Sequence, residues 1–193
     1  TYFTGNSKGF HCMPRGELMS NFLSNSNLGL VIGRQGQVVG SMQWNLTFIT
    51  DVITDFNLFY RGGGMTYPLY LYNENNGQRS LGEGLERIPN LEPSIIDKIA
   101  DGLELTFTPE KVNSEDTFAP IDLLDYIYAV LHSPSYREKY KEFLKIDYPR
   151  IPYPLNNNSF WQLVDLGCEL RQIHLLENSV VDNFITVYPV EGN

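Results

Sequence analysis

The hydrophobic pattern of this chain changes character near its middle. Up to about residue 72, short runs of β-branched and aromatic residues are separated by Gly, Asn and Ser, as in Leu28–Ile32 and Asn45–Val52, and such runs predict strands. Farther along, apolar residues recur at helical spacing in Ile121–Leu131 and Ser159–Glu177. The chain therefore predicts an α+β fold, with a β-rich N-terminal half of hairpins and a mixed sheet and a helical C-terminal half.

Weaker patterns complete this assignment. The predicted additional helices are Glu17–Leu23, Pro93–Asp101 and Ser135–Leu144. The predicted additional strands are Val38–Met42, Asn57–Tyr60, Pro68–Tyr72, Glu104–Thr108 and Val180–Val187. The segment Tyr148–Pro154 contains three prolines, which remove backbone donors, and predicts an extended crossing segment.

The length of 193 residues suits one domain. We divide residues 1–193 into a β-rich part (1–79), an acidic connecting part (80–117) and a helical part (118–193). Because the first residue is Thr, we expect the chain to be an excerpt from a longer polypeptide. No apolar run approaches the ~20 residues that span a membrane. The only cysteines, Cys12 and Cys168, are too few for a disulfide framework and suit a cytoplasmic protein.

Charge is unevenly distributed along the chain. The net charge is −9, of which −8 lies in residues 80–132, whereas residues 1–79 carry +1 and residues 133–193 carry −2. This balance argues against a protein coated in basic charge for non-specific nucleic-acid binding. A polyanion would have to contact the first 79 residues or the basic run Arg137–Lys145.

The sequence contains no recognisable catalytic or metal-binding motif. Phosphate-binding loops, a GxSxG elbow and HExxH are all missing. His132 is placed at a helix end, where an imidazolium would complement the helix dipole, and His174 is interpreted as a packed or capping residue. A site built from His11, Cys12, Cys168 and His174 would match no standard zinc spacing. We therefore expect no catalytic residue, no metal and no cofactor in this chain.

The segment Gly33-Arg34-Gln35-Gly36 is the sharpest local motif. A GxxG with a basic residue resembles the phosphate clamp of KH RNA-binding modules, but that clamp joins two helices. Here a predicted strand precedes Gly33, so a hairpin turn is favoured. Such a turn would present Arg34, Gln35 and Gln37, whose side-chain types pair with guanine and adenine edges. A KH-like RNA-binding module remains an alternative, as does a non-catalytic protein-interaction domain, which the acidic middle segment would suit.

Several segments together carry a family resemblance. They are Tyr2–Arg15, Leu28–Val31, Arg34–Gln35, Phe48–Asp51, Pro68–Tyr72, Asp125–Pro134, Tyr136–Arg137, Phe143–Pro152 and Leu166–Leu176. In this order they resemble the C-terminal specificity region of type ISP restriction–modification enzymes. The resemblance covers nearly the whole chain, except roughly residues 74–117.

The resemblance implies a target-recognition domain that reads a short DNA site for an adenine-N6 methyltransferase. Enzymes of this type combine nuclease, helicase-like ATPase, methyltransferase and recognition parts in one polypeptide. The parts that bind S-adenosylmethionine and ATP with Mg should lie upstream, and no Asn-Pro-Pro occurs here. The implied partners are duplex DNA and the upstream methyltransferase domain. The parent chain would be a methyltransferase and restriction endonuclease, while this region would have no activity of its own.

Adenine methylation requires the base to leave the stack, so the recognition part must hold the duplex in register. Contacts to the phosphates would hold the duplex in position, and contacts to the base edges would read its sequence. Our candidates for phosphate contact are Lys8, Arg15 and Arg61. Gly62, Gly63 and Gly64 would let the main chain approach closely, and Arg34, Gln35 and Gln37 are the candidates for base edges.

Overall fold

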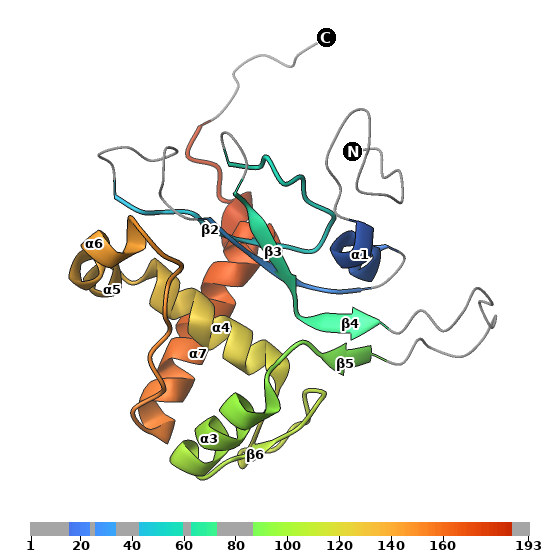
Figure 1. The fold of residues 1–193 in the computed structure, drawn as a ribbon, viewed down its shortest axis with the longest axis vertical. Coiled ribbons are helices and arrows are strands. Elements are labelled where there is room, and N and C mark those ends of the chain that lie inside the picture. The colour runs from blue at the N-terminus through green and yellow to red at the C-terminus, as the bar shows by residue number, and fades with distance from the viewer. Residues whose placement is uncertain (1–15, 24–25, 34–42, 60–62, 73–86, 187–193) are drawn as a thin grey trace, which may run out of the picture.

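The structure is a computed structural model that describes residues 16–23, 26–33, 43–59, 63–72 and 87–186 (Figure 1). Strands dominate the first half of this part and helices the second, so the predicted α+β class is confirmed. Figure 1 shows the strands of the first half above and to the right, with the helices of the second half below and to the left.

A three-stranded antiparallel sheet forms the centre of the first half. Its order is β2 (Thr47–Thr50), β1 (Gly29–Ile32) and β3 (Met65–Pro68), so both edges of β1 are paired. All four residues of β1 are buried, as expected for the central strand. A short helix, α1 (Gly16–Met19), and a 3-10 turn, η1 (Ser20–Phe22), precede the sheet.

Two smaller sheets connect the halves. β4 (Tyr70–Tyr72) pairs with β5 (Arg87–Pro89) in antiparallel fashion, and β6 (Thr106–Phe107) pairs with β7 (Thr117–Phe118) in parallel fashion. Between them lies α3 (Pro93–Leu103), which buries Ile96, Ile99 and Leu103. The described part of residues 80–117 is therefore a folded unit with a helix of its own.

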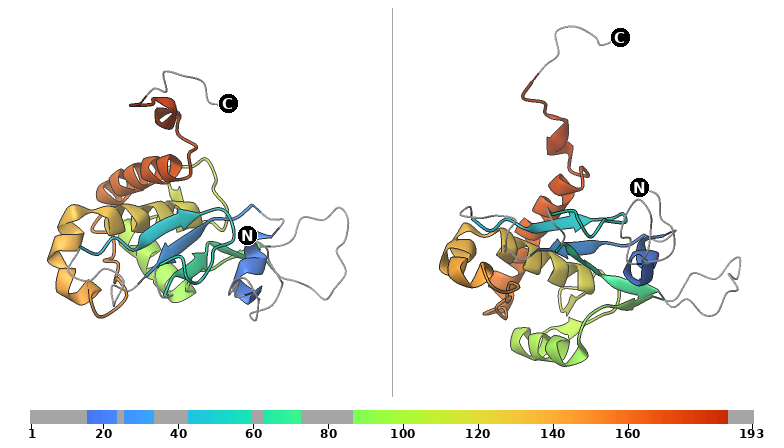
Figure 2. Two further views of the ribbon diagram at one scale, coloured as in Figure 1. Left: turned by 90° about the horizontal axis from the view of Figure 1, so that it is seen from above. Right: turned by 45° about the horizontal axis from the view of Figure 1, so that its top comes forward.

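The second half is built around α4 (Pro120–His132), ten of whose residues are buried. Asp122 accepts a hydrogen bond from the Ala119 amide at 2.8 Å and thereby caps its first turn. The short helices α5 (Pro134–Lys139) and α6 (Lys141–Leu144) follow, and then α7 (Asn157–His174) and a 3-10 turn, η2 (Ser179–Asp182). In the right view of Figure 2 the chain after α7 leads away from the body.

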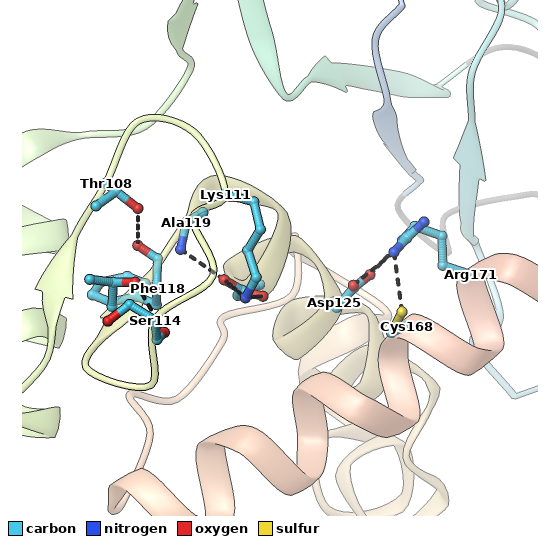
Figure 3. A network of polar contacts seen from close by, with 10 residues as sticks. Thr108, Lys111, Ser114, Phe118, Ala119, Asp125, Cys168 and Arg171 are labelled. Atoms are coloured by element: carbon cyan, nitrogen blue, oxygen red, sulfur yellow. Dashed lines mark hydrogen bonds and ion pairs between the residues drawn. The ribbon is translucent and has the colours of Figure 1, made fainter.

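The contact between α4 and α7, where the two helices cross, holds the helical half together. Both views of Figure 2 show the two helices side by side. At the crossing, a Cβ added to Gly167 would lie 1.9 Å from the Asp125 carbonyl oxygen, so only glycine permits this approach. Beside it, the Asp125 carboxylate accepts two hydrogen bonds from Arg171, at 2.7 and 3.0 Å (Figure 3). Burial raises the pKa of Asp125 above the ordinary carboxyl range, and Arg171 opposes that shift.

Tyr128 connects α4 to both its neighbours. This fully buried side chain places its hydroxyl 2.6 Å from Nδ1 of His174 on α7. The backbone of Ile49 on β2 is a second polar contact of the same hydroxyl. The hydroxyl of Tyr128 on α4 therefore contacts both the sheet and α7.

Most predicted elements are confirmed, with five corrections. Asn57–Tyr60 is wrong as a strand, because Asp55 accepts bonds from the amides of Asn57 and Leu58 and folds residues 55–58 into a turn. Val180–Val187 is wrong as a strand, because Asn178 caps the 3-10 turn and the described residues that follow, 183–186, are irregular and exposed.

The remaining corrections concern boundaries. Pro68 ends a strand instead of starting one, which the unpaired side of edge strand β3 permits. Ser135–Leu144 is interrupted at Tyr140. The hairpin that follows Gly33 is longer than predicted, because β1 pairs with β2, which begins only at Thr47. Residues 34–36 of the predicted turn and the predicted strand Val38–Met42 lie outside the described residues.

The crossing yields a stability prediction. Replacing Gly167 with Ala should lower the free energy of unfolding by roughly 2–4 kcal/mol, because the new methyl meets immovable backbone. Gly102→Ala on α3 is the matched control. Its Cβ meets no atom within 4 Å, so stability should stay level or rise by up to about 1 kcal/mol. Denaturant unfolding measures both variants, and equal stability of the two would contradict the assignment.

Candidate nucleic-acid interface

One end of the three-stranded sheet gathers three connections. Ile32, the last residue of β1, pairs with Thr47 at the start of β2 and with Met65 at the start of β3. Gly33, residues 43–46 and residues 63–64 therefore lie together, and we call this region the loop end. It is the place where the predicted base-reading segment leaves the sheet.

The structure brings the roots of two predicted contact segments to the loop end. Arg34, Gln35 and Gln37 follow Gly33, while Arg61 and Gly62 precede Gly63. These five residues lie outside the described part of the chain. Gly33, which precedes Arg34, and Gly64, which follows Gly62 by two residues, both approach the ring of Phe59. A Cβ would lie 2.7 Å from that ring at Gly33 and 3.4 Å from it at Gly64.

Main-chain and indole hydrogen bonds fix the start and the finish of residues 34–42. The Gly33 amide donates to the Leu46 carbonyl at 2.9 Å, and the Gly33 carbonyl accepts from Nε1 of Trp44 at 2.9 Å. Trp44 is only 3% exposed. Phe59 closes over Gly33 and stacks on Phe48 with ring centroids 5.4 Å apart. The residues that flank the segment are thus fixed by contacts within the core, and we call these contacts the frame.

Gly63 is a predicted contact residue that the structure describes, together with its neighbour Gly64. Its φ of 91° lies in the left-handed region that favours glycine. No atom lies within 4 Å of the position that a Cβ would occupy. Among the described residues its surroundings are therefore open, as the predicted close approach of this main chain to DNA requires.

Arg137 places a positive charge beside the frame. Its guanidinium lies 5.6 Å from the centroid of the Trp44 ring, its Nε donates to the Leu131 carbonyl at 2.7 Å, and Nη2 is 3.2 Å from Nδ1 of His132. Burial lowers the pKa of this half-buried group. Within the described residues no carboxylate forms an ion pair with it.

A positive strip continues from Arg137 along α5, α6 and the segment that follows. Its exposed members are Lys139, Lys141, Lys145 and Arg150. Three of them form i,i+3 ion pairs, with Glu138, Glu142 and Asp147. Exposed pairs of this kind contribute about 0–1 kcal/mol each, so a phosphate competes readily for the cations. Tyr136 donates from its hydroxyl to the Arg150 carbonyl at 2.9 Å and fixes the strip's last member.

Lys8 and Arg15 are predicted contacts that the structure does not describe. The helix that follows Arg15 is α1, and its neighbour Phe22 packs on Gly29, at the opposite end of β1 from Gly33. The described residues that follow Arg15 therefore lie at the other end of β1 from the loop end.

The two histidine predictions need correction. Burial first, and then the positive Arg137, lower the pKa of His132 to about 4, so the ring is neutral near pH 7 and is no imidazolium complementing a helix dipole. Nε2 of the same ring is buried without a hydrogen-bond partner in the described structure. His174 is exposed to solvent and not packed in the core, although its ring centroid lies 5.7 Å from that of Tyr128.

A search of the described residues for metal-binding arrangements finds no group of three or more His, Cys, Asp or Glu side chains that could hold an ion. Cys168 instead accepts a hydrogen bond from Arg171 at 3.3 Å. Nor is any described helix long and apolar enough to cross a membrane.

The comparisons with known proteins give the family. The model of the Type ISP C-terminal specificity domain matches residues 1–193. The chain belongs to this family. A solved structure, a DrdV–DNA complex determined by cryo-electron microscopy, is similar over 82% of this chain with 23% identity and a TM-score of 0.58. The match covers 13% of that chain, so this domain spans about an eighth of its length. No curated protein sequence matches.

The family match confirms the resemblance seen in the sequence, and it supports DNA target recognition as the function of this specificity domain. The KH-like alternative loses its structural basis, because it needs a helix ending at Gly33 and the chain there is strand β1. The sequence did not reveal the role of Trp44 or the contact of the Arg137 guanidinium with the Trp44 ring. The tryptophan shortly after the GxxG was a signal, but its contact with a residue far along the chain follows from no local pattern.

The buried histidine predicts a pH dependence. Below about pH 6.5 the unfolded chain gains a proton at His132 that the folded chain does not take up until about pH 4. The contribution of this group to stability is thus complete above pH 6.5 and is lost as the pH falls toward 4. His132→Phe should reduce the loss of unfolding free energy between pH 7 and pH 4.5, as measured by denaturant titrations. An unchanged loss in the variant would show that this histidine titrates normally.

Proposed function

We propose that this domain recognises a short duplex DNA target for a restriction–modification enzyme that methylates adenine at N6. In this proposal the domain has no catalytic activity and holds no cofactor. The observation that carries it is the loop end, where the roots of two predicted contact segments meet beside Arg137 and the positive strip. Membership of the specificity-domain family gives the class of target.

The loop end suits base reading for a physical reason. Discrimination by Arg and Gln depends on bidentate hydrogen bonds with fixed geometry. A segment rooted on a sheet and a buried indole loses less freedom on binding than a free loop does. Segment 34–42 begins one residue after Gly33 and ends two residues before Trp44, so both its ends have such roots.

The distribution of charge sets the direction from which DNA approaches. The loop end and helices α5 and α6 of the positive strip lie at the C-terminal end of α4, whereas α3 lies near the N-terminal end (Figure 1). With 13 residues, α4 separates the two regions by about 20 Å, which exceeds the Debye length of about 8 Å at physiological salt. The acidity of α3 is therefore largely screened from DNA bound at the strip.

The proposal also places the remaining machinery. An upstream methyltransferase domain of the same polypeptide would bind S-adenosylmethionine, and a helicase-like part would bind ATP with Mg. This domain would hold the duplex for the former. An enzyme that modifies bacterial DNA works in the cytoplasm, and the free thiol of Cys168 suits that compartment.

The strip can be tested through the salt dependence of DNA binding. In the full polypeptide that carries this domain, Lys139→Gln and Lys145→Gln should weaken binding to all duplexes alike. Each lost phosphate contact should lower the slope of log K against log salt by about 0.9.

Two sets of variants serve as controls for the strip. Glu138→Gln and Glu142→Gln free the cations of Lys141 and Lys145 and should strengthen binding. Glu115→Gln adds the same charge in the β6–β7 connection and should have less effect. If Glu115→Gln strengthened DNA binding as much as Glu138→Gln and Glu142→Gln do, the net charge of the protein alone would explain the effect. A complete lack of salt-sensitive DNA binding would contradict the proposed function.

Base reading is tested by variants that keep the charge. Arg34→Lys retains the cation but loses the planar fork, and Gln35→Ala removes an amide without changing the charge. Each should cost about 1–3 kcal/mol on the target selected from random duplexes, and little on unrelated DNA. Competition binding against single-base variants of the target measures this. A loss that is uniform across sequences would assign these residues to the phosphates instead.

A further inference from the structure

Phe48 is an exposed aromatic residue on the edge strand β2. The register pairs it with Val31 of β1, which in turn pairs with Thr66 of β3. Paired residues of an antiparallel sheet point to the same side, so these three side chains share one face. Val31 and Thr66 are 1% and 4% exposed, whereas Phe48 is 45% exposed. Of the three, only Phe48 therefore reaches the surface.

The segment 51–59 covers this face of the sheet and holds the Phe48 ring. The hydroxyls of Thr54 and Thr66 lie 2.6 Å apart, which fixes the segment over β3. At its end, Phe59 stacks on Phe48 with an interplanar angle of 28° and is itself only 5% exposed. One side of the Phe48 ring is thus fixed by a buried partner, and the remainder of the ring is open to solvent.

The ring lies beside the loop end. Phe59, on which it stacks, also packs on Gly33 and Gly64. Phe48 follows Trp44 by four residues, and four residues span at most about 14 Å. Base pairs in a duplex follow one another at about 3.4 Å. The ring therefore lies within about four base pairs of the anchor of segment 34–42, which is inside a short target.

The chemistry of this surface excludes phosphate as its contact. An apolar ring offers no hydrogen bond to a phosphate oxygen, and the segment 51–59 carries Asp51 and Asp55 but no Lys or Arg. In the major groove, where Arg and Gln read base edges, the apolar group that DNA presents is the C5 methyl of thymine. Insertion between base pairs is the other apolar mode of binding, but a wedge needs both faces of its ring, and Phe59 occupies one of them.

We propose that Phe48 is a specificity-determining residue that contacts the C5 methyl of one thymine in the DNA target. The inference rests on the proposed function, because it places the loop end in the major groove. A target that is methylated at adenine contains at least one A·T pair, so a thymine is always present. Phe48 then reads a position that hydrogen bonds from segment 34–42 leave ambiguous.

The test combines a change in the protein with a change in the DNA. In the full polypeptide, each thymine of the target selected from random duplexes is replaced in turn by uracil, which lacks only the methyl group. At one position the unaltered protein should bind the uracil duplex about fourfold more weakly, as expected for one buried methyl. In Phe48→Ala the thymine and uracil duplexes should bind equally at that position, as measured by competition binding.

Two variants serve as controls. Phe48→Leu keeps an apolar side chain and should keep part of the preference for thymine. Leu166→Ala removes an apolar side chain that is 60% exposed on α7, away from the sheet, and should keep the whole preference. A purely structural role of Phe48 would lower the affinity for thymine and uracil duplexes by the same factor.

The two proposals fail in different ways. If no thymine shows a uracil effect, or if the effect is the same in Phe48→Ala as in the unaltered protein, the thymine contact is wrong and the proposed function stands. Equal weakening of both duplexes in Phe48→Ala would likewise overturn the contact alone. Absence of salt-sensitive DNA binding in the unaltered polypeptide would instead overturn the proposed function.

Discussion

The contact of Gly167 with the Asp125 carbonyl sets the separation of α4 and α7, and the rest of the helical half depends on that separation. Because the helices approach so closely, Arg171 reaches the buried Asp125 carboxylate and Tyr128 reaches His174. The same phenol contacts the backbone of β2, so the position of the sheet follows from the crossing. A wider separation would break the polar contacts that join three elements, leaving a buried carboxylate without its guanidinium, which is costly.

The central helix also separates two kinds of surface. At its C-terminal end, Arg137 satisfies the Leu131 carbonyl and lies over Trp44, so the helix end and the frame of segment 34–42 share one guanidinium. At its N-terminal end, Lys111 pairs with Asp122, and α3 presents its carboxylates nearby. The net charge of −9 therefore does not conflict with DNA binding, because α3, with its carboxylates, and the positive strip lie at different ends of α4.

The elements that the sequence predicted well are those whose pattern is local. The helix from Pro120 has a proline start and a long amphipathic repeat, and β1 has a compact apolar run, so both appear as expected. The failures needed information from elsewhere in the chain. Val180 and its neighbours have strand-forming residues but find no strand to pair with, and residues 57–59 turn because Asp55 captures their amides. The register that brings Gly33 and Gly64 to one phenylalanine, and the tie between Trp44 and Arg137, depend on tertiary packing that no local pattern encodes.

The frame around Gly33 uses main-chain atoms, one indole and two aromatic rings, all outside segment 34–42. A sequence change confined to residues 34–42 leaves every one of these anchoring groups in place. The proposal that this segment reads bases therefore makes its exchange between relatives a direct route to engineered specificity, provided that Gly33, Trp44 and Phe59 are kept.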